Sequence, residues 1–299
     1  MEYDILKGYT IINGFGFTSL GYPYNVHNAI IVKGNTASHY ESPQYDVPEH
    51  TIQEYIEFIN NNQIQKAILM LDSIDFLPMC PSLKFIDLIL PREAMSFFDF
   101  SPLYEMPEIK DFSCQNQYGE RKECLSEIDY LKMNGLIRLG IHVNKGALNY
   151  NKVETLKTLH VSGFKGANRD LTDLFCSKEL DTLRLIQCGI HSLNGIETSH
   201  KMQCLYLYYN RSLSDISALY KVKGTLKALR IENCPKIQDF SALSELENLE
   251  LLELSGSNIL TSLDFLKTMK SLKTFTFNMN VLDGDLSLCM NLSYVYSGK

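Results

Sequence analysis

The sequence predicts an α/β protein built as a stack of similar units, each with a strand, a turn and an apolar return segment. Three observations support this fold class: a short apolar pattern recurs along most of the chain, a restricted polar position follows each copy, and a second apolar group closes each unit. One such unit has too little apolar surface to fold alone, so the units must stack on their neighbours.

The first observation is the recurrence of LxxLxL, with any apolar residue allowed at the L positions. Clear copies are LIRLGI at residue 136, LKTLHV at 156, LDTLRL at 180, MQCLYL at 202, LKALRI at 226, LELLEL at 249 and LKTFTF at 272. Weaker copies are IQKAIL at 64, LKFIDL at 83, IKDFSC at 109 and LSYVYS at 292. From residue 136 onward the copies begin 20 to 24 residues apart, a regularity that chance does not produce.

The second observation is a restricted position three residues after the last apolar residue of each copy. A polar side chain there can turn inward and bond the backbone groups left free where the chain leaves the strand. Cysteine is a small substitute that tolerates burial, and Phe164 is the exception to the pattern. The predicted ladder of inward structural residues is Asn144, Cys188, Asn210, Cys234, Ser257 and Asn280.

The third observation is the apolar group after each turn, whose spacing fits a short helix or 3-10 turn, as in LSDISALYKVKGTL (213–226) and IQDFSALSELENL (237–249). These repeats resemble the leucine-rich-repeat family, and SDISALYKV and QDFSALSEL are most similar to its bacterial, internalin-like class. The resemblance is strong over residues 130–292 and moderate over 64–129. It implies a curved solenoid with a parallel β-sheet on the concave face and short helices, 3-10 turns and loops on the convex face.

The first sixty residues lack the repeat. GYTIINGFGF (8–17) and NAIIVKG (28–34) predict strands, and ESPQYDVPE (41–49) predicts a loop. Thr51 and Glu54 form a capping-box pattern before apolar residues at helical spacing, which predicts a helix. We therefore predict a small N-terminal α+β cap over 1–63 and a leucine-rich-repeat solenoid over 64–299, irregular to about residue 135. A separate functional domain in 1–63 is the alternative.

Composition and charge narrow the function classes. The 299-residue chain is 45% hydrophobic and 21% charged, and its formal net charge is −7. It has no dense Lys/Arg run of the kind nucleic-acid binders carry, and no apolar run long enough for a bilayer. The opening MEYDILKGYTIING does not look like a signal peptide. We therefore expect a cytoplasmic protein with neither a nucleic-acid nor a membrane partner.

The sequence contains little that predicts catalysis. NGFGFTSLG (13–21) has neither the Walker ending nor the GxGxxG spacing. His142 and His160 fall at nearly equal positions in adjacent repeats, but a metal site would need a third ligand. The eight cysteines form no CxxC pair, so buried thiols are expected, and only the outward Cys204 is a candidate for reactivity. We expect no enzymatic activity, no cofactor and no metal.

The predicted sheet surface is the best candidate for function. Side chains alternate along a strand, so the third, fifth and seventh residues of each unit face the open side. Tyrosine and arginine, which are enriched at binding hot spots, gather in the middle of this surface. Strand propensity and solubility would also explain them. The predicted partner-binding residues are His142, His160, Arg184, Tyr206, Tyr208, Arg230, Glu232 and Glu253.

We therefore expect a non-enzymatic protein-interaction module, and an inhibitor or immunity-type protein is one version that the family resemblance implies. One alternative is an enzyme or small-ligand site in residues 1–63 and the loops at 91–108 and 115–128. Another is a cell-surface adhesin whose signal has been removed.

The chain stops at LSYVYSGK, inside its last predicted strand. An open edge can pair with another chain, so we expect weak self-association there, unless the chain is truncated or a short edge is tolerated.

Overall fold

A computed structural model describes residues 2–6, 8–13, 15–17, 23–25, 29–34, 50–90, 98–116, 126–174, 177–292 and 294–297. Two compact units make up the chain, residues 1–150 and 151–299. The predicted loop at 41–49 lies outside the described residues, as do residues 91–97 and 117–125 of the long early loops. The predicted boundary at residue 63 stays a sequence-based prediction.

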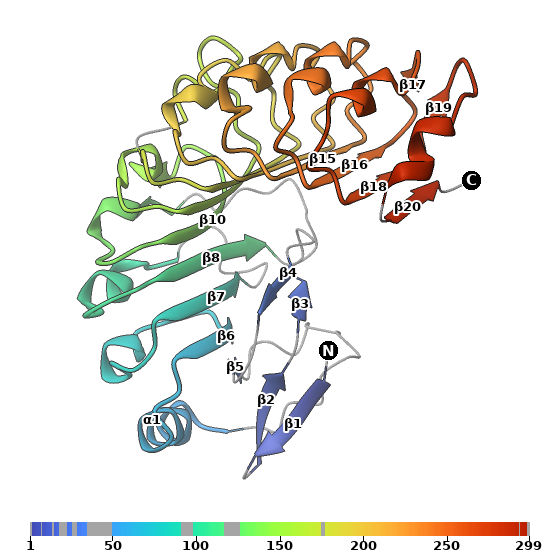
Figure 1. The fold of residues 1–299 in the computed structure, drawn as a ribbon. Coiled ribbons are helices and arrows are strands. Elements are labelled where there is room, and N and C mark those ends of the chain that lie inside the picture. Colours follow the sequence, from blue (N-terminus) through green and yellow to red (C-terminus); the bar gives the residue numbers. More distant parts are fainter. Residues whose placement is uncertain are drawn as a thin grey trace. The chain divides into compact units, whose positions relative to one another are not determined.

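The first unit is built on a mixed β-sheet (Figure 1). Its strands follow the order β1 (Glu2–Leu6), β2 (Tyr9–Asn13), β5 (Ala29–Lys33), β6 (Lys66–Met70), β7 (Phe85–Leu90), β8 (Asp111–Asn116) and β10 (Arg138–His142). β1, β2 and β5 pair antiparallel, and β5 to β10 pair parallel. The strands predicted at 8–17 and 28–34 and the weak repeats at 64, 83 and 109 are thus confirmed as strands.

Shorter elements complete the first unit. β3 (Phe15–Phe17) pairs with β4 (Pro23–Asn25), and β9 (Ile128–Asp129) pairs with β11 (Ala147–Leu148). The helical segments are α1 (Ile52–Asn61), η2 (Leu77–Met79), η4 (Ser101–Glu105) and η6 (Tyr130–Lys132), and η7 (Tyr150–Lys152) crosses into the second unit. In the part of the chain that the structure describes, no helix is both long and apolar enough to cross a membrane.

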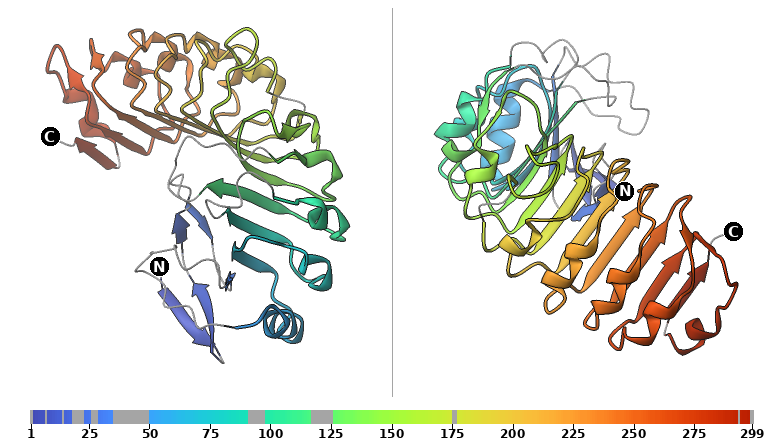
Figure 2. Two further views of the ribbon diagram at one scale, coloured as in Figure 1. Left: turned by 180° about the vertical axis from the view of Figure 1, so that it is seen from behind. Right: turned by 90° about the horizontal axis from the view of Figure 1, so that it is seen from above.

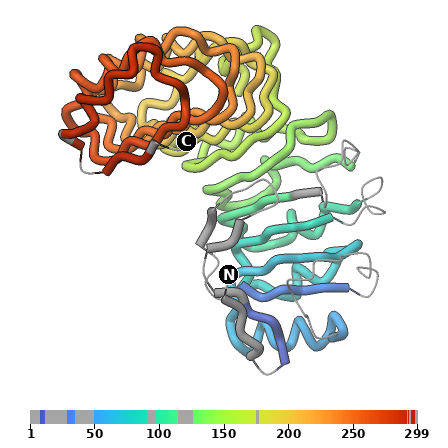
Figure 3. Tube along the Cα trace, turned by 90° about the vertical axis from the view of Figure 1, so that its right-hand side faces the viewer, coloured from blue at the N-terminus to red at the C-terminus, as the bar shows by residue number. Residues whose placement is uncertain are grey.

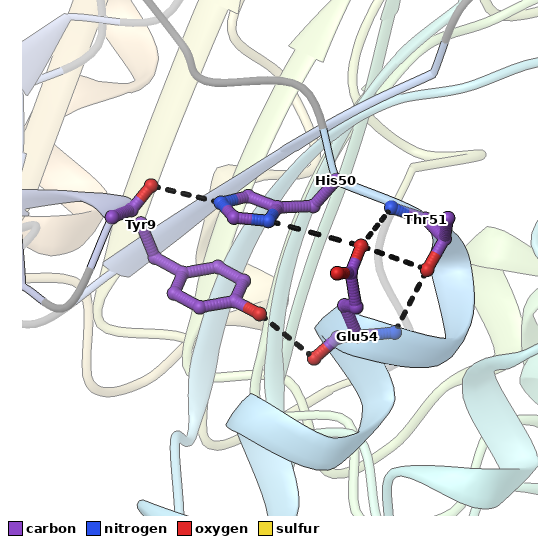
Figure 4. Close-up of polar contacts among 5 residues, drawn as sticks. Tyr9, His50, Thr51 and Glu54 are labelled. Atoms are coloured by element: carbon purple, nitrogen blue, oxygen red, sulfur yellow. Dashed lines mark hydrogen bonds and ion pairs between the residues drawn. The ribbon is translucent and has the colours of Figure 1, made fainter.

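Helix α1 begins at the predicted capping box. The Thr51 backbone N–H donates to Glu54 Oε2 at 2.7 Å, and the Glu54 N–H donates to Thr51 Oγ1 at 3.3 Å (Figure 4). The Tyr9 ring stacks between His50 and Phe58, with ring centroids 4.0 and 3.9 Å away. The Tyr9 hydroxyl also donates to the Glu54 carbonyl oxygen at 3.2 Å. Strand β2 is therefore held against the first turn of the helix.

The capping box predicts a measurable loss of stability. Thr51→Ala removes the acceptor of the Glu54 N–H, so we expect the free energy of unfolding of the first unit to fall by about 1 kcal/mol. Urea unfolding followed by circular dichroism measures the change. Thr51→Ser keeps the hydroxyl and should stay within about 0.5 kcal/mol of the parent chain. An equal loss in both variants would assign the effect to the Thr51 methyl group instead.

The second unit repeats the predicted order of strand, turn and return segment (Figures 1 and 3). Its strands follow the order β12 (Thr158–Ser162), β13 (Thr182–Ile186), β14 (Cys204–Tyr208), β15 (Ala228–Glu232), β16 (Leu251–Ser255), β18 (Thr274–Phe277) and β20 (Tyr294–Ser297). Every neighbouring pair is parallel. β17 (Ile259–Leu260) and β19 (Asn280–Val281) form a separate short pair.

The return segments that follow β13, β14, β15, β16 and β18 carry single 3-10 turns, as the apolar spacing predicts. They are η8 (Ile196–Thr198), η9 (Ser217–Val222), η10 (Ser241–Glu245), η11 (Asp264–Lys267) and η12 (Ser287–Asn291). Figure 2 shows these turns along one side of the stack and the strands side by side along the other. The register sets equal positions opposite each other, as in Leu205 with Leu229, so the apolar positions form continuous buried rows.

The predicted inward position is buried at Cys188, Asn210 and Cys234. Asn210 satisfies two backbone groups at once: its Oδ1 accepts from the Cys188 N–H at 2.8 Å, and its Nδ2 donates to the Leu185 carbonyl at 3.1 Å. Burial raises the pKa of the Cys188 thiol to about 12 and that of Cys234 to about 11. Both thiols are therefore un-ionised at neutral pH, and their side chains pack in the core.

The expectation of an inward side chain at Ser257 is corrected, because Ser257 is exposed and Asn258 is buried in its place. Gly256 has a φ of +137°, whereas the equivalent residues of the three preceding units lie between +50° and +55°. Because of the altered turn, the side chain that points inward belongs to the residue one position later in the chain. Asn258 Nδ2 there donates to the carbonyl oxygens of Cys234 at 3.0 Å and Ile237 at 2.7 Å.

The expectation of an inward side chain is also corrected at Asn280, which lies in β19 and is exposed, while the preceding Met279 is buried. An apolar side chain therefore fills the inward position of this unit. Asn144, in the first unit, is half-buried and accepts from the Gly146 N–H at 2.8 Å. That bond closes a local turn two residues long.

Candidate functional site

One row of side chains crosses the sheet of the second unit. The fifth residues of successive LxxLxL repeats pair directly with one another across neighbouring strands. They are His160, Arg184, Tyr206, Arg230, Glu253, Thr276 and Tyr296. Because side chains alternate along a strand, this row lies on the face opposite the buried leucines. Neighbouring strands are about 4.8 Å apart, so the row is continuous. We call these seven residues the central row.

The first part of the central row is buried. His160 is 6% exposed and Arg184 is 7% exposed, and the adjacent Tyr208 is 8% exposed. The Arg184 guanidinium carbon lies 4.3 Å from the centroid of the Tyr208 ring, a cation–π contact in which each group covers the other. These three residues occupy the predicted face, but the prediction that they are accessible to a partner is corrected. Strand alternation determines a side chain's direction and not what covers it.

The middle of the central row is accessible and charged. The Arg230 side chain is 39% exposed and that of Glu253 is 31% exposed, and Arg230 Nε lies 3.1 Å from Glu253 Oε2. The contact is an ion pair without the alignment of a hydrogen bond. Arg230 also lies 5.6 Å from the centroid of the Tyr206 ring. The guanidinium is therefore held in place by groups from two neighbouring strands.

The charge of Arg230 is reinforced by its surroundings. Burial opposes the cation, but a hydrogen bond with the Tyr208 side chain and the nearby Glu253 carboxylate raise the pKa of Arg230. Burial, with Cys204 beside it, raises the pKa of Tyr206 to about 12. Tyr206 is therefore a neutral phenol at physiological pH and can both donate and accept a hydrogen bond.

Two aromatic residues of this face were missed by the sequence-based assignment. Tyr294 and Tyr296 of β20 are 55% and 58% exposed. They pair in register with Thr274 and Thr276, so they lie on the same face as the central row. Tyr296 is the fifth residue of the last repeat, LSYVYS, so reading the fifth positions through one more repeat would have identified it.

The remaining predicted residues lie as follows. Glu232, the seventh residue of its repeat and the last residue of β15, is half-buried, and Asn233 Nδ2 donates to its Oε1 at 3.5 Å. His142 is exposed at the end of β10 in the first unit, so its part in binding stays a sequence-based prediction. Over the described ranges, no group of three or more His, Cys, Asp or Glu residues is arranged to hold a metal ion.

The stacked parallel strands, the inward turn residues and the outer 3-10 turns define the α/β leucine-rich-repeat fold. The chain is similar to the crystal structure of an internalin (inlF) from Listeria monocytogenes str. 4b F2365, at 17% identity and a TM-score of 0.52, over 81% of this chain and 70% of that one. This similarity confirms the predicted leucine-rich-repeat fold, and an internalin is among the structures that share it.

Two further solved structures are less similar. One is a TLR13–ssRNA13 complex, at 16% identity and a TM-score of 0.40, over 80% of this chain and 44% of that one. The other is the functional domain of InlJ from Listeria monocytogenes, which includes a cysteine ladder, at 15% identity and a TM-score of 0.30, over 72% and 62% of the two chains. No family model and no curated protein matches the sequence.

Proposed function

We propose that the chain is a non-enzymatic protein-interaction module that binds its partner through the accessible part of the central row. The residues in contact would be Tyr206, Arg230, Glu232, Glu253 and Tyr296. The observation that carries this proposal is the way Arg230 is held, between the Tyr206 ring, the Tyr208 side chain and the Glu253 carboxylate.

A side chain that is already ordered loses less conformational entropy when a partner binds. Arg230 meets this condition because three side chains fix its position before any partner arrives. Tyrosine and arginine are also the residue types most enriched at binding hot spots. Tyr206 and Arg230 are therefore the expected anchors.

The charges of the accessible row favour a protein partner. Arg230 and Glu253 present both signs one strand apart, a pattern that suits a protein surface with complementary charges more than a polyanion. The net charge of −7 suits a basic partner surface. We place this partner in the cytoplasm, and an inhibitor or immunity-type role would follow if the row covers the partner's own functional surface.

A double substitution tests the binding face. Tyr206→Ala with Arg230→Ala should weaken partner affinity by roughly 30-fold to 1000-fold, because each hot-spot truncation typically costs about 2 kcal/mol and two such losses add only in part. Affinity capture from native cytosol with quantitative mass spectrometry identifies the partner, and titration with the purified partner then measures the dissociation constant.

The matched control uses the same residue types elsewhere. Tyr220 and Arg211 are both exposed and lie outside the strands, so Tyr220→Ala with Arg211→Ala should leave the dissociation constant unchanged. Equal capture by both double variants would show that the partner binds away from the central row.

We also propose that the chain associates weakly with a second copy through β20. The support is that β20 pairs with β18 alone among the described strands and carries two exposed tyrosines.

A further inference from the structure

Three positively charged side chains gather in the second unit where the chain leaves strands β12, β13 and β14. Lys165, Gly189 and Arg211 hold equivalent positions in three successive units, each directly after the inward position. Arg169 lies in the loop that follows Lys165, and its Nη1 donates to the Gly189 carbonyl at 3.2 Å. Lys165, Arg169 and Arg211 are all exposed, and we call these three residues the basic cluster.

Gly189 lets two of these cations lie side by side. A Cβ atom on Gly189 would lie 2.8 Å from Lys165 Cγ and 3.2 Å from Arg169 Nη1, so both side chains occupy the space that a larger residue would fill. The φ of Gly189 is outside the left-handed region, so its backbone does not require glycine. What the glycine provides here is therefore room for the two cations.

Arg169 is held in this place at a cost in backbone strain. Its φ is +56°, a conformation that glycine or asparagine adopts more easily than arginine. The Arg169 carbonyl accepts from the His191 N–H at 2.6 Å, which ties this backbone to the next unit. Strained residues of this kind are concentrated at functional sites. The turn alone does not call for arginine, so the guanidinium is the reason to expect a function.

The cations of the basic cluster form no ion pair with any described residue. Elsewhere in the second unit, exposed lysines pair across one unit: Lys201 Nζ lies 2.5 Å from Glu179 Oε2, and Lys223 Nζ lies 3.0 Å from Glu245 Oε2. Such a pair needs a carboxylate at the neighbouring position, and between Lys165 and Arg211 that position is glycine.

Two acidic residues of the same loop bond to its backbone. Asp170 Oδ1 accepts from the Thr172 N–H at 3.0 Å, and Asp173 Oδ2 accepts from the Ala167 N–H at 2.7 Å. The three cations repel one another, because like charges are brought together without a carboxylate in ion-pair contact among the described residues. An anion bound among them would relieve this repulsion.

We propose that the basic cluster binds a phosphate group. A phosphate monoester carries about two negative charges at neutral pH, which suits three cations better than a single carboxylate does. Arginine matches phosphate oxygens with paired hydrogen bonds, and lysine adds a compact charge. A phosphorylated protein side chain and free phosphate present this same group. The site is separate from Tyr206 and Arg230, so it goes beyond the function proposed for the central row.

The first experiment measures the fluorescence anisotropy of a dye-labelled peptide that carries one phosphoserine between glycines. The full chain should bind this peptide at low salt. Replacing the cluster by Lys165→Ala, Arg169→Asn and Arg211→Ala should weaken the affinity about tenfold or more, because charge-assisted hydrogen bonds are lost.

A matched control removes the same charge elsewhere. Lys178, Lys223 and Lys270 are exposed lysines of the second unit outside its strands, and their triple alanine variant should bind the peptide within about twofold of the parent chain. Equal affinity of the two triple variants, or no binding by the parent chain, overturns the proposal.

Competition then identifies the ligand chemistry. Inorganic phosphate should displace the labelled peptide, and it distinguishes the two sources of the group: a requirement for about tenfold or more excess over unlabelled phosphopeptide assigns the site to a phosphorylated side chain, and equal potency assigns it to free phosphate. The same peptide with glutamate in place of phosphoserine should compete poorly. Equal competition by the glutamate peptide would overturn the assignment to phosphate.

The single variant Arg169→Asn separates a binding role from a structural one. Asparagine suits the left-handed backbone, so stability in urea should equal or exceed that of the parent chain, while the affinity for the phosphopeptide falls about threefold or more. Lower stability with unchanged affinity would show that Arg169 only fastens the loop. The Tyr206→Ala and Arg230→Ala double variant should bind the phosphopeptide like the parent, so failure at the central row and failure at the basic cluster are separate results.

Discussion

Replacing Asn210 by alanine is expected to lower the free energy of unfolding by about 2 to 6 kcal/mol. The Asn210 side chain is fully buried and bonds the Cys188 N–H and the Leu185 carbonyl. Alanine would leave both backbone groups buried without these bonds, and each such loss costs about 1 to 3 kcal/mol. Urea unfolding, followed by tyrosine fluorescence and circular dichroism, measures the change.

Asn278 provides a matched control for this substitution. Its Oδ1 accepts from the Gly256 N–H at 2.8 Å across 22 residues, the same separation as between Asn210 and Cys188. Asn278 is exposed, so water can replace the bond, and Asn278→Ala should cost less than about 1 kcal/mol. Similar losses in the two variants would contradict the role assigned to burial at Asn210.

Replacing Phe275 by alanine is expected to lower the free energy of unfolding by about 3 to 5 kcal/mol. The Phe275 side chain is fully buried in β18. Its ring stacks on Phe277 with centroids 4.7 Å apart and meets Phe265 edge-on at 6.1 Å. Alanine removes these contacts and leaves a cavity that the surrounding strands cannot fully close. Chemical unfolding curves give the loss directly.

Two variants separate the cavity from a general effect on β18. Phe275→Leu keeps most of the buried volume and should cost about half of the alanine value or less. Thr276 is half-buried on the opposite face of the same strand, so Thr276→Ala should change stability by less than about 1 kcal/mol. A loss at Thr276 as large as that at Phe275 would show that strand propensity, not core packing, controls this region.

The strands of the second unit were predictable because their signal is local and repeated. Each LxxLxL copy from residue 156 onward became a parallel strand in register with its neighbour, and each return segment from 213 onward became a 3-10 turn. The inward position was predictable where the turn length stays constant, as at Asn210. The prediction was wrong at Ser257, because the unusual backbone of Gly256 makes the next residue, Asn258, the one that points inward.

The sequence predicted the direction of the side chains at the candidate site, but it did not predict which of them are accessible to solvent. The alternation of strand side chains correctly placed Arg184, Tyr206, Tyr208 and Arg230 on one face. These residues differ in their exposure in the structure. Arg184 and Tyr208 cover each other and are buried, whereas the Arg230 side chain is more than a third exposed. The tyrosines of β20 were missed, although the same alternation applies to them.

The sequence by itself determined the leucine-rich-repeat fold, the strands of the second unit and the face to which each strand residue points. These features depend on the two-residue period of a strand and on the spacing of one unit, both of which can be read along the chain. Only the tertiary structure decided which residues of the central row remain accessible and how Arg230 is held. Those properties depend on side chains from neighbouring strands more than 20 residues away, whose packing no local pattern specifies.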